Sequence, residues 1–132
     1  MRSEGRGHVR IFKNAWFERF ARKQKIQDAA LREAIDRAEQ GLIDADLGGG
    51  IIKQRVARPG QGRSGGYRTL ILYRREHRAF FVYGFAKSRQ SNINAEEEAA
   101  FKKAAAHVLE LTDEQLAALI RNGQFLEVDH DG

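Results

Sequence analysis

Two apolar segments joined by a short polar turn constrain the fold of this chain more than any other feature. Residues 67–73 (YRTLILY) and 79–86 (AFFVYGFA) are rich in β-branched and aromatic side chains, which favour strands. A third segment, 51–57 (IIKQRVA), predicts another strand before them. Because the links between the three segments are too short for crossover connections, the strands are expected to form an antiparallel meander. Segments 67–73 and 79–86 do not alternate cleanly, which is typical of central strands covered on both faces.

Helical patterns flank these strands. After a short first strand at residues 8–12, apolar residues recur at helical spacing in 14–25, where Trp16, Phe17 and Phe20 are expected in the core. A second helix is predicted from an N-cap at Asp28 to a stop at Gly41.

Two capping-box patterns predict the C-terminal helices. Asn94 with Glu97, and Thr112 with Gln115, each place a capping side chain three residues before its acidic or amide partner. Residues 124–128 follow as a short edge strand or a tail. The fold class is therefore α+β: an antiparallel sheet in the order β-α-α-β-β-β-α-α, with an N-terminal helical hairpin and C-terminal helices packed on one side.

The composition is that of one globular domain. The chain has 132 residues, of which 42% are hydrophobic and 31% charged. We expect a single domain at 9–128, a disordered stretch at 1–8 and a tail at 129–132. The absence of cysteine excludes disulfides, thiol catalysis and zinc sites built on Cys. The N-terminus lacks the apolar run of a signal peptide, and no segment reaches the roughly 20 apolar residues of a membrane span, so a cytoplasmic location is expected.

Positive charge is concentrated in the predicted sheet. Between Lys53 and Arg89, ten residues are Lys or Arg and one, Glu76, is acidic, whereas the whole chain carries +5. With a pI near 9.8, nucleic acid is the leading partner, ahead of an acidic protein or anionic lipid.

Strand periodicity gathers several of these cations. Lys53 and Arg55 are two residues apart and share a face, and Arg68 begins the adjacent strand. Lys87 and Arg89 follow the third strand at the end that should lie beside Arg68, so these side chains are predicted to converge. The alternative is that each is a solvated residue that protects a strand from aggregation.

A glycine-rich loop, residues 59–66, lies between the first two strands of the meander. Arg58 and Arg63 accompany its glycines, and no Gly-Lys-Ser/Thr follows, so it is not a Walker motif. It is interpreted as a long hairpin connection, as an arm that contacts phosphates without reading sequence, or as both. Tyr67 either stacks on a base or packs in the core. The four histidines show no metal-ligand spacing.

These motifs together resemble a known family. The run LGGGIIKQRVARPGQGRSGGYRTLILY, followed by AFFVYGFAKSRQSNI, resembles the RelE/HigB group of toxins from type II toxin–antitoxin systems, within the RelE/ParE superfamily. The shared features are a glycine turn, K-x-R-V-A, a glycine-rich basic loop and a G-G-x-R strand start, and the resemblance covers residues 9–111.

The resemblance implies a RelE-like fold and an mRNA interferase, an endoribonuclease that cuts messages on the ribosome without a metal or other cofactor. The 2′-OH would attack the adjacent phosphate, and a helix-turn-helix antitoxin would silence the toxin. By motif, Lys53 and Arg55 match the family's basic pair, and Lys53 is a feasible base because neighbouring cations favour its neutral amine. Arg68 would clamp the phosphate, and Lys87 and Arg89 would neutralise the transition state.

The sequence departs from the family at one position. Relatives carry a tyrosine shortly after the last basic cluster, but residues 88–94 contain no aromatic residue and Asn94 stands in its place. The general acid/base partner is therefore unassigned. Two non-catalytic alternatives stay open: an inhibitor of DNA gyrase with the same fold, and a general RNA-binding module.

Overall fold

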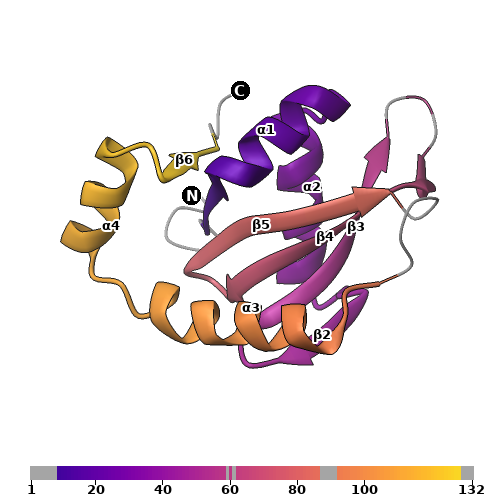
Figure 1. Ribbon diagram of the computed structural model, residues 1–132. Helices are drawn as coiled ribbons and strands as arrows, with labels where there is room; N and C mark the ends of the chain where they lie inside the picture. The colour runs from indigo at the N-terminus through magenta and orange to yellow at the C-terminus, as the bar shows by residue number, and fades with distance from the viewer. Residues whose placement is uncertain (1–8, 59, 61, 87–91, 129–132) are drawn as a thin grey trace.

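The computed structural model describes residues 9–58, 60, 62–86 and 92–128, with the backbone alone at 62–64. Within these residues the chain forms helices on a six-stranded sheet (Figure 1). The elements, in chain order, are β1 Arg10–Asn14, α1 Ala15–Gln24, α2 Asp28–Glu39, β2 Ala45–Gly48, β3 Ile51–Arg58, β4 Gly62–Arg74, β5 Arg78–Ala86, α3 Ala95–Val108, α4 Asp113–Arg121 and β6 Phe125–Glu127.

The sheet contains the predicted meander at its centre. Its spatial order is β2-β3-β4-β5-β1-β6. The pairs β2–β3, β3–β4 and β4–β5 are antiparallel. β1, the first strand of the chain, lies parallel to β5 on its other side, with Phe12 opposite Phe80. β6 pairs antiparallel with β1. The α+β class and the RelE-like meander are therefore confirmed.

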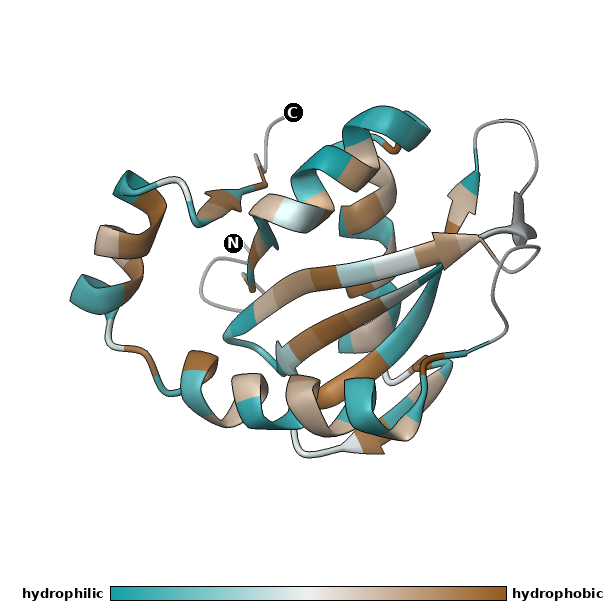
Figure 2. Cartoon of the chain, viewed as in Figure 1, coloured by the Kyte–Doolittle hydropathy of each residue, from teal (hydrophilic) through white to brown (hydrophobic). Residues whose placement is uncertain are grey.

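Helices cover both faces of the sheet, so the prediction that they pack on one side was wrong. α1 and α2 lie against one face of the sheet, and α3 lies against the other (Figure 1). Phe17, Leu31 and Ile35 of the first two helices are buried in one apolar cluster, and Ala105 of α3 and Leu116 of α4 are buried in the other. The incomplete alternation of the central strands indicated this correctly, because both faces must be apolar there. In Figure 2 the middles of β4 and β5 are accordingly brown.

Several boundaries differ from those predicted. β2 was missed because its sequence, ADLG, lacks strand-favouring residues and becomes a strand by pairing with β3 across a glycine turn. β4 begins at Gly62 and pairs with Arg58, so the loop is shorter than residues 59–66. The N-cap of α2 is Gln27 rather than Asp28, which is its first helical residue.

Other local predictions hold. Asn94 and Thr112 each form the predicted capping box at the start of α3 and α4. Residues 124–128 do contain an edge strand, β6. Phe17 is fully buried, but Trp16 is 37% exposed, stacks on Phe20 and makes a tilted ring contact with Tyr83, so its prediction as a core residue was wrong.

Candidate functional site

Three predicted cations meet in one cleft at the end of the sheet. Lys53 and Arg55 of β3 and Arg68 of β4 line a cleft of about 60 Å³ together with Asp44, Ala45 and Gln54. Arg55 and Arg68 are directly opposite each other in the β3–β4 ladder, so their side chains leave the same face of the sheet. The predicted gathering of these three residues is therefore observed.

This end of the sheet can carry charge because it lies beyond the apolar cluster that α3 and α4 cover. Ile51 belongs to the apolar cluster that α3 and α4 cover, and Lys53 and Arg55 follow it at intervals of two on the same face. On the antiparallel strand β4, Leu72 and Leu70 belong to that cluster, and Arg68 lies two residues before Leu70, on the same face. The cations of both strands therefore lie side by side at the same end of the sheet.

A buried glutamine holds the backbone beneath the cleft. Gln54 is 1% exposed, and its Nε2 donates to the carbonyls of Ala34 (2.9 Å) and Leu42 (3.3 Å). Its Oε1 accepts the backbone N–H of Asp44 at 2.7 Å. Gln54 therefore links α2, the segment before β2, and β3, and fixes the position of Asp44 relative to Arg55.

Asp44 and Arg37 complete this support. Asp44 Oδ2 accepts the backbone N–H of Arg55 at 2.7 Å and lies 3.7 Å from Nη1 of Arg37. Arg37 is 8% exposed and also donates to the Arg55 carbonyl and to Glu33. Neither residue was predicted from the sequence, because Asp44 becomes a neighbour of β3 only through the unpredicted strand β2, and Arg37 meets Arg55 only where α2 packs on the sheet.

Asn92 is a further residue that the sequence analysis missed. Its Oδ1 accepts a hydrogen bond from Lys53 Nζ at 3.0 Å and another from the backbone N–H of Ile93. An asparagine near a helix start carries no sequence signal for such a role. In this structure Lys53 therefore acts as a hydrogen-bond donor at the rim of the cleft.

Two predicted RNA-binding residues lie on the opposite face. Tyr67 is 2% exposed among the residues covered by α1 and α2, and its hydroxyl donates to Gln24 at 2.9 Å. The guanidinium of Arg58 lies 5.3 Å from the centre of the Tyr67 ring. Burial leaves Tyr67 unavailable to stack on a base, so the structure contradicts its assignment as an RNA-binding residue.

The remaining predicted site residues are not placed. Lys87 and Arg89 lie outside the described residues, and the side chain of Arg63 is among those not described. Ala86, which precedes Lys87, pairs with Tyr67 beside Arg68. The convergence of Lys87 with Arg68 stays a prediction.

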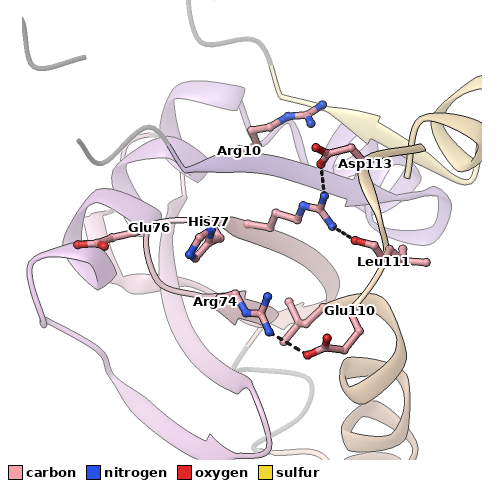
Figure 3. A pocket seen from close by; sticks show the side chains of 9 residues that line it. Arg10, Arg74, Glu76, His77, Glu110, Leu111 and Asp113 are labelled. Atoms are coloured by element: carbon pink, nitrogen blue, oxygen red, sulfur yellow. Dashed lines mark hydrogen bonds and ion pairs between the residues drawn. The ribbon is translucent and has the colours of Figure 1, made fainter. Parts of the chain in front are cut away.

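A larger pocket lies at the other end of the sheet. It has a volume of about 320 Å³ and is lined by Arg10, Arg74, Arg78 and His77, together with Glu76, Glu110 and Asp113 (Figure 3). Its arginines are paired with carboxylates: Arg74 with Glu110, Arg78 with Asp113, and Arg10 with Glu127. Because the charges in this pocket are balanced, the cleft at Arg68 is the better anion site.

No group of three potential metal ligands occurs among the described residues. None of the helices in this part of the chain could span a membrane.

A family model for the RelE toxin of the RelE/RelB toxin–antitoxin system matches residues 9–128. The chain belongs to the RelE toxin family. Among curated proteins, none matches it. Membership makes this RelE-family protein the toxin of a toxin–antitoxin system, with an antitoxin as its partner.

Proposed function

We propose that this RelE-family toxin is an endoribonuclease that cuts translated mRNA on the ribosome. The observation that supports it best is the cleft in which Lys53, Arg55 and Arg68 meet on one face of the sheet. In the proposed reaction the ribose 2′-OH attacks the adjacent phosphate and leaves a cyclic phosphate and a free 5′-OH. The reaction needs a proton acceptor, cations for the phosphorane and a proton donor for the leaving oxygen, but no metal.

The residues divide between these tasks by their chemistry. Arg68 presents a planar fork of donors that suits two oxygens of the scissile phosphate, and Arg55, opposite it, neutralises the phosphorane. Lys53 donates to Asn92 in the structure, which suits it to donate to the leaving oxygen rather than to serve as the base. Lys87 and Arg89 are proposed to hold the flanking backbone.

The remaining cations serve general RNA contact in this proposal. Arg58 and Arg63 adjoin the loop between β3 and β4 and would contact phosphates without reading sequence.

We further propose that the antitoxin is a helix-turn-helix DNA-binding protein and that the toxin acts in the cytoplasm, where its substrate is translated. Co-expression of the adjacent reading frame should then restore growth to cells that produce the toxin.

Cleavage on programmed ribosomes tests the proposal. The wild type should produce fragments with a 2′,3′-cyclic phosphate and a 5′-OH, with or without EDTA. Arg68→Ala should lower the cleavage rate on the order of 10²–10³-fold, the usual effect of removing one transition-state donor. Arg22→Ala is the matched control, because Arg22 is 74% exposed on α1 outside the cleft, and it should cleave like the wild type.

A second assay separates this activity from non-catalytic binding. A gyrase inhibitor of this fold would block supercoiling and leave the message intact on the ribosome. A general RNA-binding protein would retain uncut RNA, and its affinity would fall with salt by about one unit of log–log slope per phosphate contact. Either result, with intact message, contradicts the nuclease.

A further inference from the structure

We propose that Asp44 is the general base of this site, the group that accepts the proton of the attacking ribose 2′-OH. The proposal rests on the proposed nuclease function and adds a catalytic residue to it. Asp44 lies between α2 and β2, outside the motifs that carry the family resemblance. It enters the cleft because β2 pairs with β3 and places it beside Arg55.

The two carboxylate oxygens of Asp44 have different surroundings. Oδ2 accepts the backbone N–H of Arg55 at 2.7 Å and lies 3.7 Å from the Arg37 guanidinium. No hydrogen bond from the described part of the chain reaches Oδ1, and the side chain is 30% exposed. The protein thus anchors one oxygen and leaves the other available to a ligand in the cleft.

The other side chains of the cleft are unsuited to accept a proton. Arg55 and Arg68 carry donors alone and stay protonated in proteins, and Lys53 donates to Asn92. The Gln54 carbonyl is weakly basic and already accepts the backbone N–H of Asp44. Among the described residues that line the cleft, Asp44 is the one that bears a carboxylate.

The cleft is large enough for the reacting group to displace water. A volume of about 60 Å³ exceeds the roughly 10–15 Å³ that one water molecule needs. A ribose 2′-OH that reaches Asp44 while its phosphate meets Arg68 would lie between an acceptor and a donor. This arrangement also favours RNA over DNA, because DNA lacks the hydroxyl.

In the proposed step, one proton leaves the ribose 2′-OH and another reaches the leaving oxygen. The 2′-O–H proton passes to Asp44 Oδ1, and the oxygen lone pair forms the new bond to phosphorus. The bond between phosphorus and O5′ breaks, and O5′ leaves with its electron pair and takes a proton from the Lys53 ammonium. The products are a 2′,3′-cyclic phosphate and a 5′-OH, and water then returns Asp44 and Lys53 to their starting states.

Asp44→Asn separates catalysis from structural support. The amide oxygen of Asn can still accept the Arg55 N–H, but the amide cannot take the proton. Asp46→Asn is the matched control: Asp46 lies in the same strand region and accepts the backbone N–H of Gly48 at 2.9 Å, but it does not line the cleft. Cleavage is measured on programmed ribosomes, and binding is measured with a message that carries a 2′-O-methyl group at the cut site.

We expect Asp44→Asn to cleave about 10²–10⁴-fold more slowly, with binding unchanged within about two-fold and the thermal midpoint preserved. Asp46→Asn should match the wild type, and Asp44→Glu, which keeps a carboxylate, should cleave faster than Asp44→Asn. Cleavage by Asp44→Asn within about ten-fold of the wild type would overturn the inference, as would parallel losses of binding and cleavage. If Asp44→Asn unfolds, an Asp44→Glu protein that folds but does not cleave overturns it. If the wild type itself does not cleave, the proposed function fails, and this inference fails with it.

Discussion

The guanidinium of Arg37 donates a hydrogen bond to the backbone carbonyl of Arg55, so a buried cation of α2 holds the strand that carries the basic cleft. The same guanidinium donates to Glu33 at 2.9 Å and lies 3.7 Å from Asp44. The N–H and the C=O of Arg55 are therefore both bound by side chains. This end of β3 depends on α2 for its position.

Replacing Arg37 with methionine should destabilise the protein by about 1–3 kcal/mol. Methionine fills much of the same volume but leaves the Arg55 carbonyl and the Asp44 carboxylate without this partner, and an unsatisfied buried acceptor carries a penalty of that size. Urea unfolding measures the change. Arg22→Met, which removes an exposed pair with Glu18, is the control and should cost no more than about 0.5 kcal/mol. Equal losses in the two variants would contradict the supporting role of Arg37.

The sequence was sufficient to predict the central sheet, because strand-favouring composition and short links leave few topologies. It was also sufficient for Lys53, Arg55 and Arg68, since a period of two fixes the face that each side chain takes. The same period places Tyr67 on the face opposite Arg68, but its burial was not predicted, because the strand is apolar on both faces and its pattern does not say which helices cover each face.

The residues that sequence reasoning missed all depend on tertiary pairing. Trp16 lies beside Phe17 in the helical pattern, but its ring packs on Phe20 of the same helix and on Tyr83 of β5. Asp44 reaches the cleft through β2, whose composition does not favour a strand. Neither position could be read from local periodicity, because each depends on contacts with another element: β5 for Trp16 and β3 for Asp44.

Gly66 of the G-G-x-R motif should not tolerate alanine. An added Cβ would lie 2.0 Å from the backbone oxygen of Val56, and a strand backbone cannot move away as a flexible side chain can. Gly66→Ala should therefore separate β3 from β4 next to Arg68, with a loss of about 1–3 kcal/mol or more in urea unfolding and a slower cleavage rate. Gly60→Asn is the control: Asn tolerates its φ of +79°, and nothing lies within 4 Å of the added Cβ. A Gly66→Ala protein as stable as the wild type would refute this account of the motif.

Glu18 should make stability depend on pH on the acid side. The hydrogen bond from Lys13, at 2.7 Å, lowers the pKa of the Glu18 carboxyl below its usual value of 4.5, although partial burial opposes the shift. Because the folded-state pKa is the lower one, this contribution is present above about pH 4.5 and is lost as the pH falls through the folded-state pKa. Glu18→Gln should therefore flatten the decline of unfolding free energy between about pH 5 and pH 3. An unchanged slope in Glu18→Gln would exclude this linkage.

Arg78 should control the local stability of the C-terminal segment. Its side chain is 13% exposed, and it reaches from the start of β5 to the α3–α4 connection, where it donates to the Leu111 carbonyl at 2.7 Å and to Asp113. Arg78→Met should raise amide hydrogen exchange in α4 and β6 by about 5- to 30-fold, which corresponds to about 1–2 kcal/mol of local opening, and leave β3 and β4 protected. Arg74→Met removes a more exposed pair with Glu110 and should change exchange little. A uniform rise across all strands would instead show that Arg78 stabilises the whole domain, because α4 and β6 would then open only with the sheet.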